Sequence, residues 1–151
     1  MKKVVIAFDH RGQNLANGVK KHFEKLGYTV SIGESHDGDD YVDNAIPALK
    51  GIVSKTYDFG VLICGTGVGM AIVANRHKGI LAVHANDEAT AHFARRHEDA
   101  NVLVLGAGYE DDDYAVKALS LTKACKIVDA FINAEFEGGR HKKRVNKVNK
   151  I

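Results

Sequence analysis

The sequence predicts an α/β protein: a single-domain, three-layer α/β/α Rossmann-like fold with a five-stranded parallel sheet and a C-terminal helical extension. Two patterns predict this fold. Nearly continuous apolar runs bounded by Gly, Asp or Asn recur along the chain, as is typical of parallel strands buried on both faces. Segments of helical period separate these runs, as is typical of right-handed βαβ crossovers.

The apolar runs are short and rich in β-branched residues. The expected strands are residues 3–8, 28–32, 60–63, 80–84 and 101–105. After the first strand, a helix begins near Gln13, and Gly27 ends it. A second helix includes Ile46 to Val53, and Pro47 fits it only in the first turn, where its missing N–H costs no hydrogen bond.

Three further segments have a helical period. The third and fourth helices are expected at residues 70–76 and 88–96, and a long pattern runs from about residue 114 to residue 136. Residues 137–151 are basic, are broken by glycines at the start and contain few large apolar side chains. Composition alone leaves open whether they form a solvated tail or an ordered extension of the single domain, residues 1–151.

Composition excludes several classes of protein. The 151 residues include 21 Lys+Arg and 19 Asp+Glu, a net charge of +2 that is too even for neutralising many nucleic-acid phosphates. No apolar run approaches the roughly 18 residues of a membrane helix, and the N-terminal run is too short for a signal peptide. Cys64 and Cys125 form no CxxC pair, which favours a reducing compartment. We therefore expect a soluble cytoplasmic domain with no nucleic-acid or membrane partner.

Reactive side chains follow three of the expected strands, where open α/β sheets bind ligands. Asp9 and His10 follow the first strand, Cys64 follows the third, and His84 ends the fourth. The most specific signal is Cys-Gly-Thr-Gly-Val-Gly at residues 64–69. Its glycines permit a tight turn that brings several N–H groups to a ligand, and the helix that follows adds positive charge.

The same field favours a thiolate over a thiol at Cys64. A thiolate beside such N–H groups can remove a proton from carbon while the amides stabilise the resulting enolate oxygen. The loop has other interpretations. The loop does not match the dinucleotide-binding motif because the third glycine is missing, although Asp87 stands where a ribose-binding acid would lie. It does not match a P-loop because no Gly-Lys-Ser/Thr follows. An inert buried thiol is the remaining alternative.

The other polar residues have ordinary structural interpretations. Asp9 is well placed to cap the first helix, His84 is expected to pack at a strand end, and His97 is a cation at a helix C-terminus. No pair of histidines has a zinc-ligand spacing supported by a third ligand, so no metal is expected.

Several motifs in register resemble the type B ribose-5-phosphate isomerases, a group that includes galactose-6-phosphate isomerase subunits. They are Phe-Asp-His at residues 8–10, Leu-Ile-Cys-Gly-Thr-Gly-Val-Gly at 62–69 with Ala-Asn at 74–75, Arg-His-Glu-Asp-Ala-Asn-Val-Leu at 96–103, and Glu-Gly-Gly-Arg-His at 137–141 with Arg-Val at 144–145. The resemblance covers nearly the whole chain.

The resemblance implies an aldose–ketose isomerase of pentose phosphate metabolism that forms a cis-enediolate without a metal or an organic cofactor. Ribose 5-phosphate and ribulose 5-phosphate are the implied substrates. Another pentose, tetrose or hexose phosphate and a non-catalytic phospho-sugar binding protein remain alternatives. Cys64 would be the base, and Thr66 and His97 would assist ring opening. The implied substrate-binding residues are Asp9, His10, Tyr41, Gly65, Gly67, Val68, Gly69, Asn75, Arg140 and Arg144.

Within that set, the loop amides would hold the enediolate oxygen and Asn75 would order the loop. Asp9 and Tyr41 would contact sugar hydroxyls, whereas His10, Arg140 and Arg144 would bind the phosphate. His97 precedes its own strand, so it starts at the edge of the sheet opposite Cys64 and reaches a site most easily in a neighbouring subunit. We therefore expect a homodimer with shared active sites, and a tetramer built from two such dimers is the alternative.

The chain departs from the family pattern at several positions. Tyr-Val-Asp at residues 41–43 is more similar to a galactose-6-phosphate isomerase subunit, and Glu98 replaces a neutral amide. The phosphate-binding arginine that the family has after the fifth strand is Gly108 here, so phosphate binding should be weaker unless Arg11 or Lys78 substitutes for it. An acidic insertion follows at residues 110–113.

Overall fold

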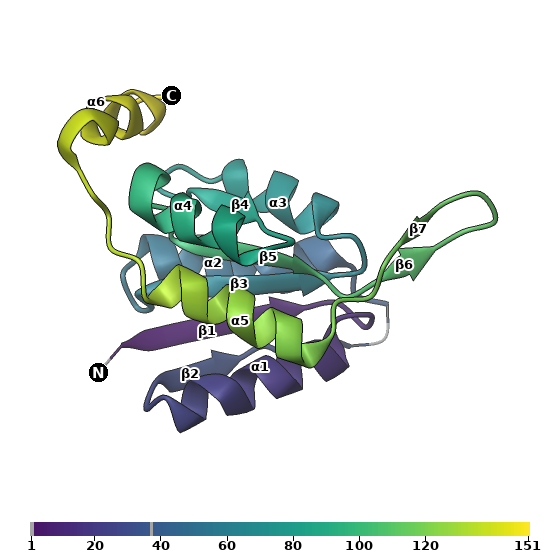
Figure 1. The fold of residues 1–151 in the computed structure, drawn as a ribbon. Helices are drawn as coiled ribbons and strands as arrows, with labels where there is room; N and C mark the ends of the chain where they lie inside the picture. Colours follow the sequence, from purple (N-terminus) through teal and green to yellow (C-terminus); the bar gives the residue numbers. More distant parts are fainter. Residues whose placement is uncertain (1, 37) are drawn as a thin grey trace.

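The computed structural model describes residues 2–36 and 38–151, and its centre is a parallel sheet with the strand order β2-β1-β3-β5-β4 (Figure 1). The strands are β1 Lys3–Phe8, β2 Thr29–Ile32, β3 Phe59–Cys64, β4 Ala82–His84 and β5 Val102–Gly106. The predicted α/β/α fold with five parallel strands is confirmed. The predicted domain of residues 1–151 includes Met1 and Asp37, which lie outside the described residues.

Helices cover both faces of the sheet (Figure 1). One face packs against α1 Gln13–Lys25, α4 Glu88–Glu98 and α5 Leu121–Ile132, and the other against α2 Tyr41–Val53 and α3 Val68–Asn75. Alternate strand residues point to opposite faces, so Ile63 joins the first apolar core and Cys64 joins the second.

The strand order creates a switch point between β1 and β3. From β1 the chain crosses through α1 to β2, and it then returns through α2 to β3 on the other side of β1. Phe8 of β1 is in register with Ile63 of β3, so the residues that follow, Asp9 and Cys64, lie side by side at this edge of the sheet. This is the position at which open parallel sheets bind ligands.

The predicted place of Pro47 is wrong. The helix α2 begins at Tyr41 because the Asp40 carboxylate accepts the N–H groups of Val42 and Asp43, and the Asp43 carboxylate accepts the N–H of Asp40. This reciprocal cap starts the helix well before the apolar periodicity begins, so Pro47 lies inside the helix rather than in its first turn.

The predicted long helix from residue 114 is also wrong at its start. There, β6 Tyr109–Glu110 and β7 Ala115–Val116 pair as an antiparallel hairpin that projects from the body (Figure 1). The helix begins only after Ser120, whose Oγ accepts the N–H of Lys123 at 3.1 Å. The acidic insertion is therefore the tip of a hairpin.

The basic end of the chain is ordered rather than a solvated tail, because it contains α6 Gly139–Val148. This helix stands at a corner of the molecule beside α4 and buries His141 and Val145 (Figure 1). No helix among the described residues is long and apolar enough to cross a membrane.

Candidate active site

The loop after β3 turns back onto the sulfur of Cys64. The N–H of Gly67 donates to Cys64 Sγ at 3.2 Å, and Gly67 has a φ of 82°, which favours glycine. The N–H of Val68 donates to Thr66 Oγ1 at 3.1 Å at the start of α3. Although Cys64 is only 4% exposed, its sulfur faces the loop and accepts an amide hydrogen, an arrangement suited to a thiolate.

The same loop presents unpaired backbone donors. Within the part of the chain that the structure describes, the N–H groups of Gly65, Thr66 and Gly69 make no hydrogen bond to protein. They lie at or just before the N-terminus of α3, where the helix dipole adds partial positive charge. The loop therefore combines a thiol with unpaired N–H donors.

His84 supports this loop from β4. A Cβ placed on Gly67 would lie 2.5 Å from His84 Nε2, so the imidazole packs directly on the turn. Burial lowers the pKa of His84, and its Nε2 is buried without a hydrogen-bond partner among the described residues. The expected packing role of His84 agrees with this contact.

Gly67→Ala tests the fit of the turn. Gly27 also has a positive φ, of 86°, but no atom of the described residues lies within 4 Å of a Cβ placed there. Gly27→Ala should therefore cost only the left-handed conformation, roughly 1–2 kcal/mol. Gly67→Ala should lower the melting temperature further and disturb the loop, and adding His84→Ala should recover part of the difference. Equal melting temperatures for the two single variants would contradict the predicted collision.

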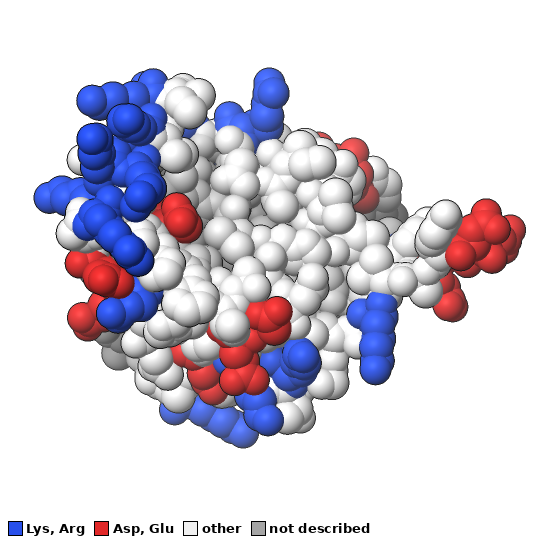
Figure 2. All heavy atoms as spheres, turned by 45° about the horizontal axis from the view of Figure 1, so that its top comes forward, with Lys and Arg blue, Asp and Glu red and all other residues white. Residues whose placement is uncertain are grey.

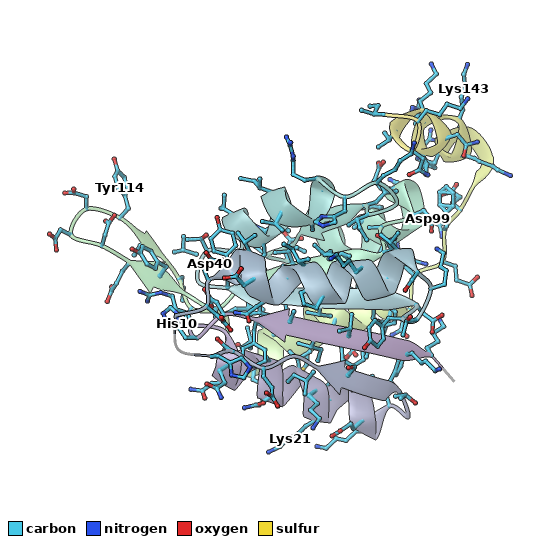
Figure 3. The ribbon with its side chains drawn as sticks, turned by 180° about the vertical axis from the view of Figure 1, so that it is seen from behind. His10, Lys21, Asp40, Asp99, Tyr114 and Lys143 are labelled. Atoms are coloured by element: carbon cyan, nitrogen blue, oxygen red, sulfur yellow. The ribbon has the colours of Figure 1, made fainter. Side chains whose placement is uncertain are left out.

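Asp9 and His10 form the turn on the other side of the switch point. The Asp9 carboxylate accepts the N–H groups of Arg11 at 3.0 Å and Gly12 at 3.2 Å. The N-cap residue of α1 is Gly12, and no side chain caps the helix. The predicted capping role of Asp9 is therefore wrong, and Asp9 orders the turn before the helix instead. His10 is exposed in this turn, at the end of the molecule that carries the hairpin (Figure 3).

Tyr41 approaches the loop from α2. Its ring carbons would lie 2.7 Å from a Cβ on Gly69, so the ring covers the first turn of α3. The structure thus brings Asp9, Tyr41 and the residue 64–69 loop to one edge of the sheet, although they are far apart in sequence.

Asn75 does not join this group. Its Nδ2 donates to the carbonyl oxygen of Ala82 and its Oδ1 accepts the N–H of Ala82, both at 2.9 Å. The side chain therefore ties the C-terminal end of α3 to β4, and among the described residues it makes no hydrogen bond to the loop at residues 64–69.

His97, Arg140 and Arg144 lie at the opposite edge, as predicted for His97. The His97 and His141 rings stack with centroids 4.1 Å apart and an angle of 11° between their planes. The N–H of Glu137 donates to the carbonyl oxygen of Arg96, which holds the start of the extension against the end of α4. Figure 3 shows Lys143 of α6 and His10 at opposite ends of the molecule.

This second cluster contains potential metal ligands. Atoms of His97, Glu137 and His141 lie within 4.8 Å of one another, a grouping that the sequence spacing did not reveal. The two rings are nearly parallel, so their in-plane lone pairs run side by side instead of converging on one ion. Burial, helped by His97, Arg140 and Arg144, lowers the pKa of His141, while Glu137 opposes that shift.

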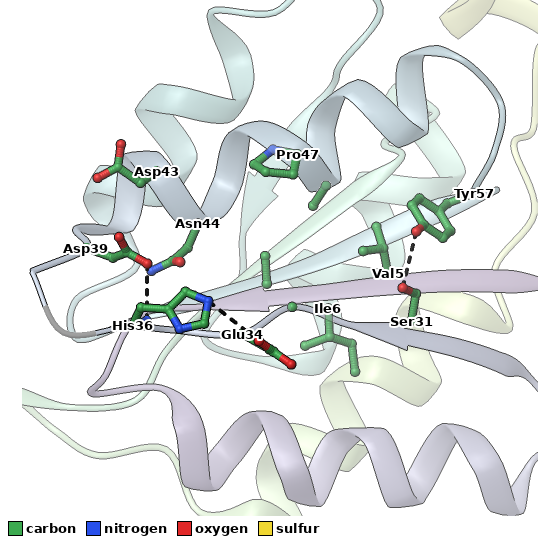
Figure 4. A pocket seen from close by; sticks show the side chains of 13 residues that line it. Val5, Ile6, Ser31, Glu34, His36, Asp39, Asp43, Asn44, Pro47 and Tyr57 are labelled. Carbon is green, nitrogen blue, oxygen red and sulfur yellow. Dashed lines mark hydrogen bonds and ion pairs between the residues drawn. The ribbon is translucent and has the colours of Figure 1, made fainter.

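A separate cavity of about 420 Å³ lies between β2 and α2 (Figure 4). Its polar contacts include His36 to Glu34 at 3.5 Å and a hydrogen bond from the Tyr57 hydroxyl to Ser31 Oγ at 3.1 Å. Glu34, Asp39 and Asp43 line it, and none of the predicted site residues does. Three carboxylates make this cavity unfavourable for a phosphorylated ligand.

The fold and the loop define a class of protein: a doubly wound α/β protein with a thiol and unpaired backbone N–H groups at its switch point. The family model described as Ribose/Galactose Isomerase matches residues 4–148. The chain belongs to this family.

Individual relatives match this chain over nearly their full length. The chain is 42% identical to a probable ribose-5-phosphate isomerase B of Mycoplasma pneumoniae, with 96% of this chain and 91% of that protein covered. The solved ribose 5-phosphate isomerase of Thermotoga maritima has a TM-score of 0.89 at 36% identity, covering 99% of both chains. The Mycoplasma genitalium ribose-5-phosphate isomerase B with bound ribulose-5-phosphate has a TM-score of 0.86 at 36% identity, covering 98% of this chain and 94% of that one.

Proposed function

We propose that this chain is an aldose–ketose isomerase that interconverts ribose 5-phosphate and ribulose 5-phosphate. One observation carries the proposal: Cys64 Sγ accepts the N–H of Gly67 inside a loop with unpaired amide donors, at the switch point of the sheet. A relative covering nearly the whole chain was solved with bound ribulose-5-phosphate, which supports the choice of substrate.

The proposed chemistry needs one base and one oxyanion site. After ring opening, aided by Thr66 and His97, the Cys64 thiolate takes the proton from C2. The C–H electron pair forms the C1–C2 double bond, and the C1 carbonyl electrons move onto oxygen, where the loop N–H groups stabilise the negative charge. The Cys64 thiol then returns the proton to C1, while the O2 hydroxyl proton moves to O1. In a cis-enediolate both carbons present one face to the sulfur, so a single thiol serves both.

We propose that the complete site is shared between two copies of this chain. His97 and the arginines of α6 lie at the edge opposite Cys64, so one copy cannot bring both to a substrate. Figure 2 shows Lys and Arg side chains gathered on α6 at one end and the acidic hairpin at the other. A two-fold dimer would place α6 of each copy over the loop of its partner, where Arg140 and Arg144 meet the phosphate.

The thiolate chemistry requires a reducing compartment, so we place the protein in the cytoplasm.

The test is a panel of sugar phosphates in D₂O, followed by NMR. We expect ribose 5-phosphate to be converted to ribulose 5-phosphate with deuterium incorporated at the transferred position. Turnover confined to galactose 6-phosphate would overturn the substrate and favour the galactose-type reaction suggested by residues 41–43. Perturbed resonances without turnover of any sugar would favour a binding protein, and turnover only on adding a different subunit would contradict the homodimer.

A further inference from the structure

A positively charged side chain borders the loop at residues 64–69. Arg11 follows His10 in the β1–α1 turn, and its guanidinium carbon lies 4.6 Å from the centroid of the Tyr109 ring. Among the described residues, its side chain forms no ion pair and no hydrogen bond. The ring holds one face of the guanidinium by a cation–π contact and leaves its N–H edge free for an anion.

Arg11 lies directly on the loop. A Cβ placed on Gly65 would lie 3.0 Å from Arg11 Cδ and 3.3 Å from both Gly108 O and Tyr109 Cβ. Glycine at position 65 therefore lets the arginine stem run along the backbone of the loop. Since Gly65 adjoins Cys64, the charge of Arg11 stands beside the proposed reaction centre.

Arg11 and the residues of the β6–β7 hairpin line an open pocket of about 410 Å³. Two cations, Arg11 and Lys117, line it together with one carboxylate, that of Glu110, whereas Asp111 and the remaining acids lie at the hairpin tip and do not line it. Gly108, with a φ of 113°, contributes no side chain. Lys78 lines a different hollow with Asn75 and Val148, so it does not reach this pocket.

We propose that Arg11, held on Tyr109, binds the phosphate group of the substrate in this pocket and that Lys117 adds a second positive charge. The proposal rests on the proposed function, because it assigns a binding group to that reaction. A guanidinium matches a phosphate through two parallel N–H···O bonds. The geometry makes the β6–β7 hairpin the support that orients the arginine, with Tyr109 as a positioning residue.

The experiment measures the binding of inorganic phosphate by calorimetry at fixed ionic strength, together with kinetics on ribose 5-phosphate. Arg11→Ala should weaken phosphate binding by about 10-fold or more, the usual loss for a charge-assisted pair. The KM should rise by a similar factor, and kcat should change far less. Arg11→Lys should lie between the two, and Tyr109→Leu should weaken binding while the charge remains. Arg76→Ala is the matched control, because it removes an exposed arginine at the other edge of the sheet.

Unchanged phosphate affinity in Arg11→Ala would overturn the proposal, as would an equal loss in Arg76→Ala or the lack of measurable phosphate binding by the unaltered protein. Thermal unfolding of each variant checks that the fold is kept.

The experiment distinguishes failure of the phosphate site from failure of the isomerase function. Weakened phosphate binding in Arg11→Ala with no turnover by the unaltered protein would leave this site standing and remove the isomerase, whereas turnover with unaltered phosphate affinity would do the reverse.

Discussion

Replacing Cys64 by serine or alanine is expected to abolish isomerisation and leave the fold intact. The proposed reaction has a single base, and loss of a positioned base costs about 10²- to 10⁴-fold in rate. Serine keeps the size of the side chain and can accept the N–H of Gly67, but its hydroxyl is not ionised near neutral pH. Cys64 lies in the apolar core under α2 and α3, but the serine hydroxyl keeps the N–H of Gly67 as a hydrogen-bond partner, so serine should destabilise the fold only modestly.

The measurement is deuterium incorporation from D₂O by NMR, with circular dichroism to verify the fold. Cys125→Ser is the matched control. Cys125 is the other free cysteine, and it lies in α5 on the far face of the sheet, where burial raises the pKa of its thiol. This control should keep full activity. If Cys64→Ser and Cys64→Ala exchange deuterium at the unaltered rate, the sulfur is not the base.

The sheet and one half of the candidate site could be predicted from local sequence. Continuous apolar runs mark β1 and β3, and topology alone brings the residues after parallel strands to one edge. Asp9 and Cys64 could therefore be placed together before any contact was known. The opposite position of His97 followed in the same way, because a residue just before a strand lies at the edge where that strand begins.

Features that depend on tertiary contacts could not be predicted. Val116 lies in a stretch whose apolar residues have a helical spacing. It belongs to strand β7 only because it pairs with Tyr109 across the acidic turn. The stacking of His97 on His141 requires α6 to dock on α4, which no local pattern encodes. The sequence indicates Arg11 as a candidate cation, but its contact with the Tyr109 ring depends on where the hairpin folds.

Mixing two inactive variants is expected to restore activity if the site is shared. In a hybrid dimer of Cys64→Ala with His97→Ala, one site carries both defects, and the other combines an intact Cys64 with an intact His97. Random exchange of equal amounts makes half of the dimers hybrid, so about a quarter of the sites are intact, and about a quarter of the unaltered activity should return.

The assay mixes the two purified variants, unfolds and refolds them together, and follows ribose 5-phosphate conversion. Mass spectrometry of differently tagged chains verifies that hybrids form. A mixture of Cys64→Ala with Cys64→Ser is the control, and it should stay inactive because no combination supplies the sulfur. If His97 served the Cys64 of its own chain, every chain in the hybrid would keep one defect. Hybrids that form without regaining activity would therefore contradict the shared site, as would a fully active monomer in light scattering.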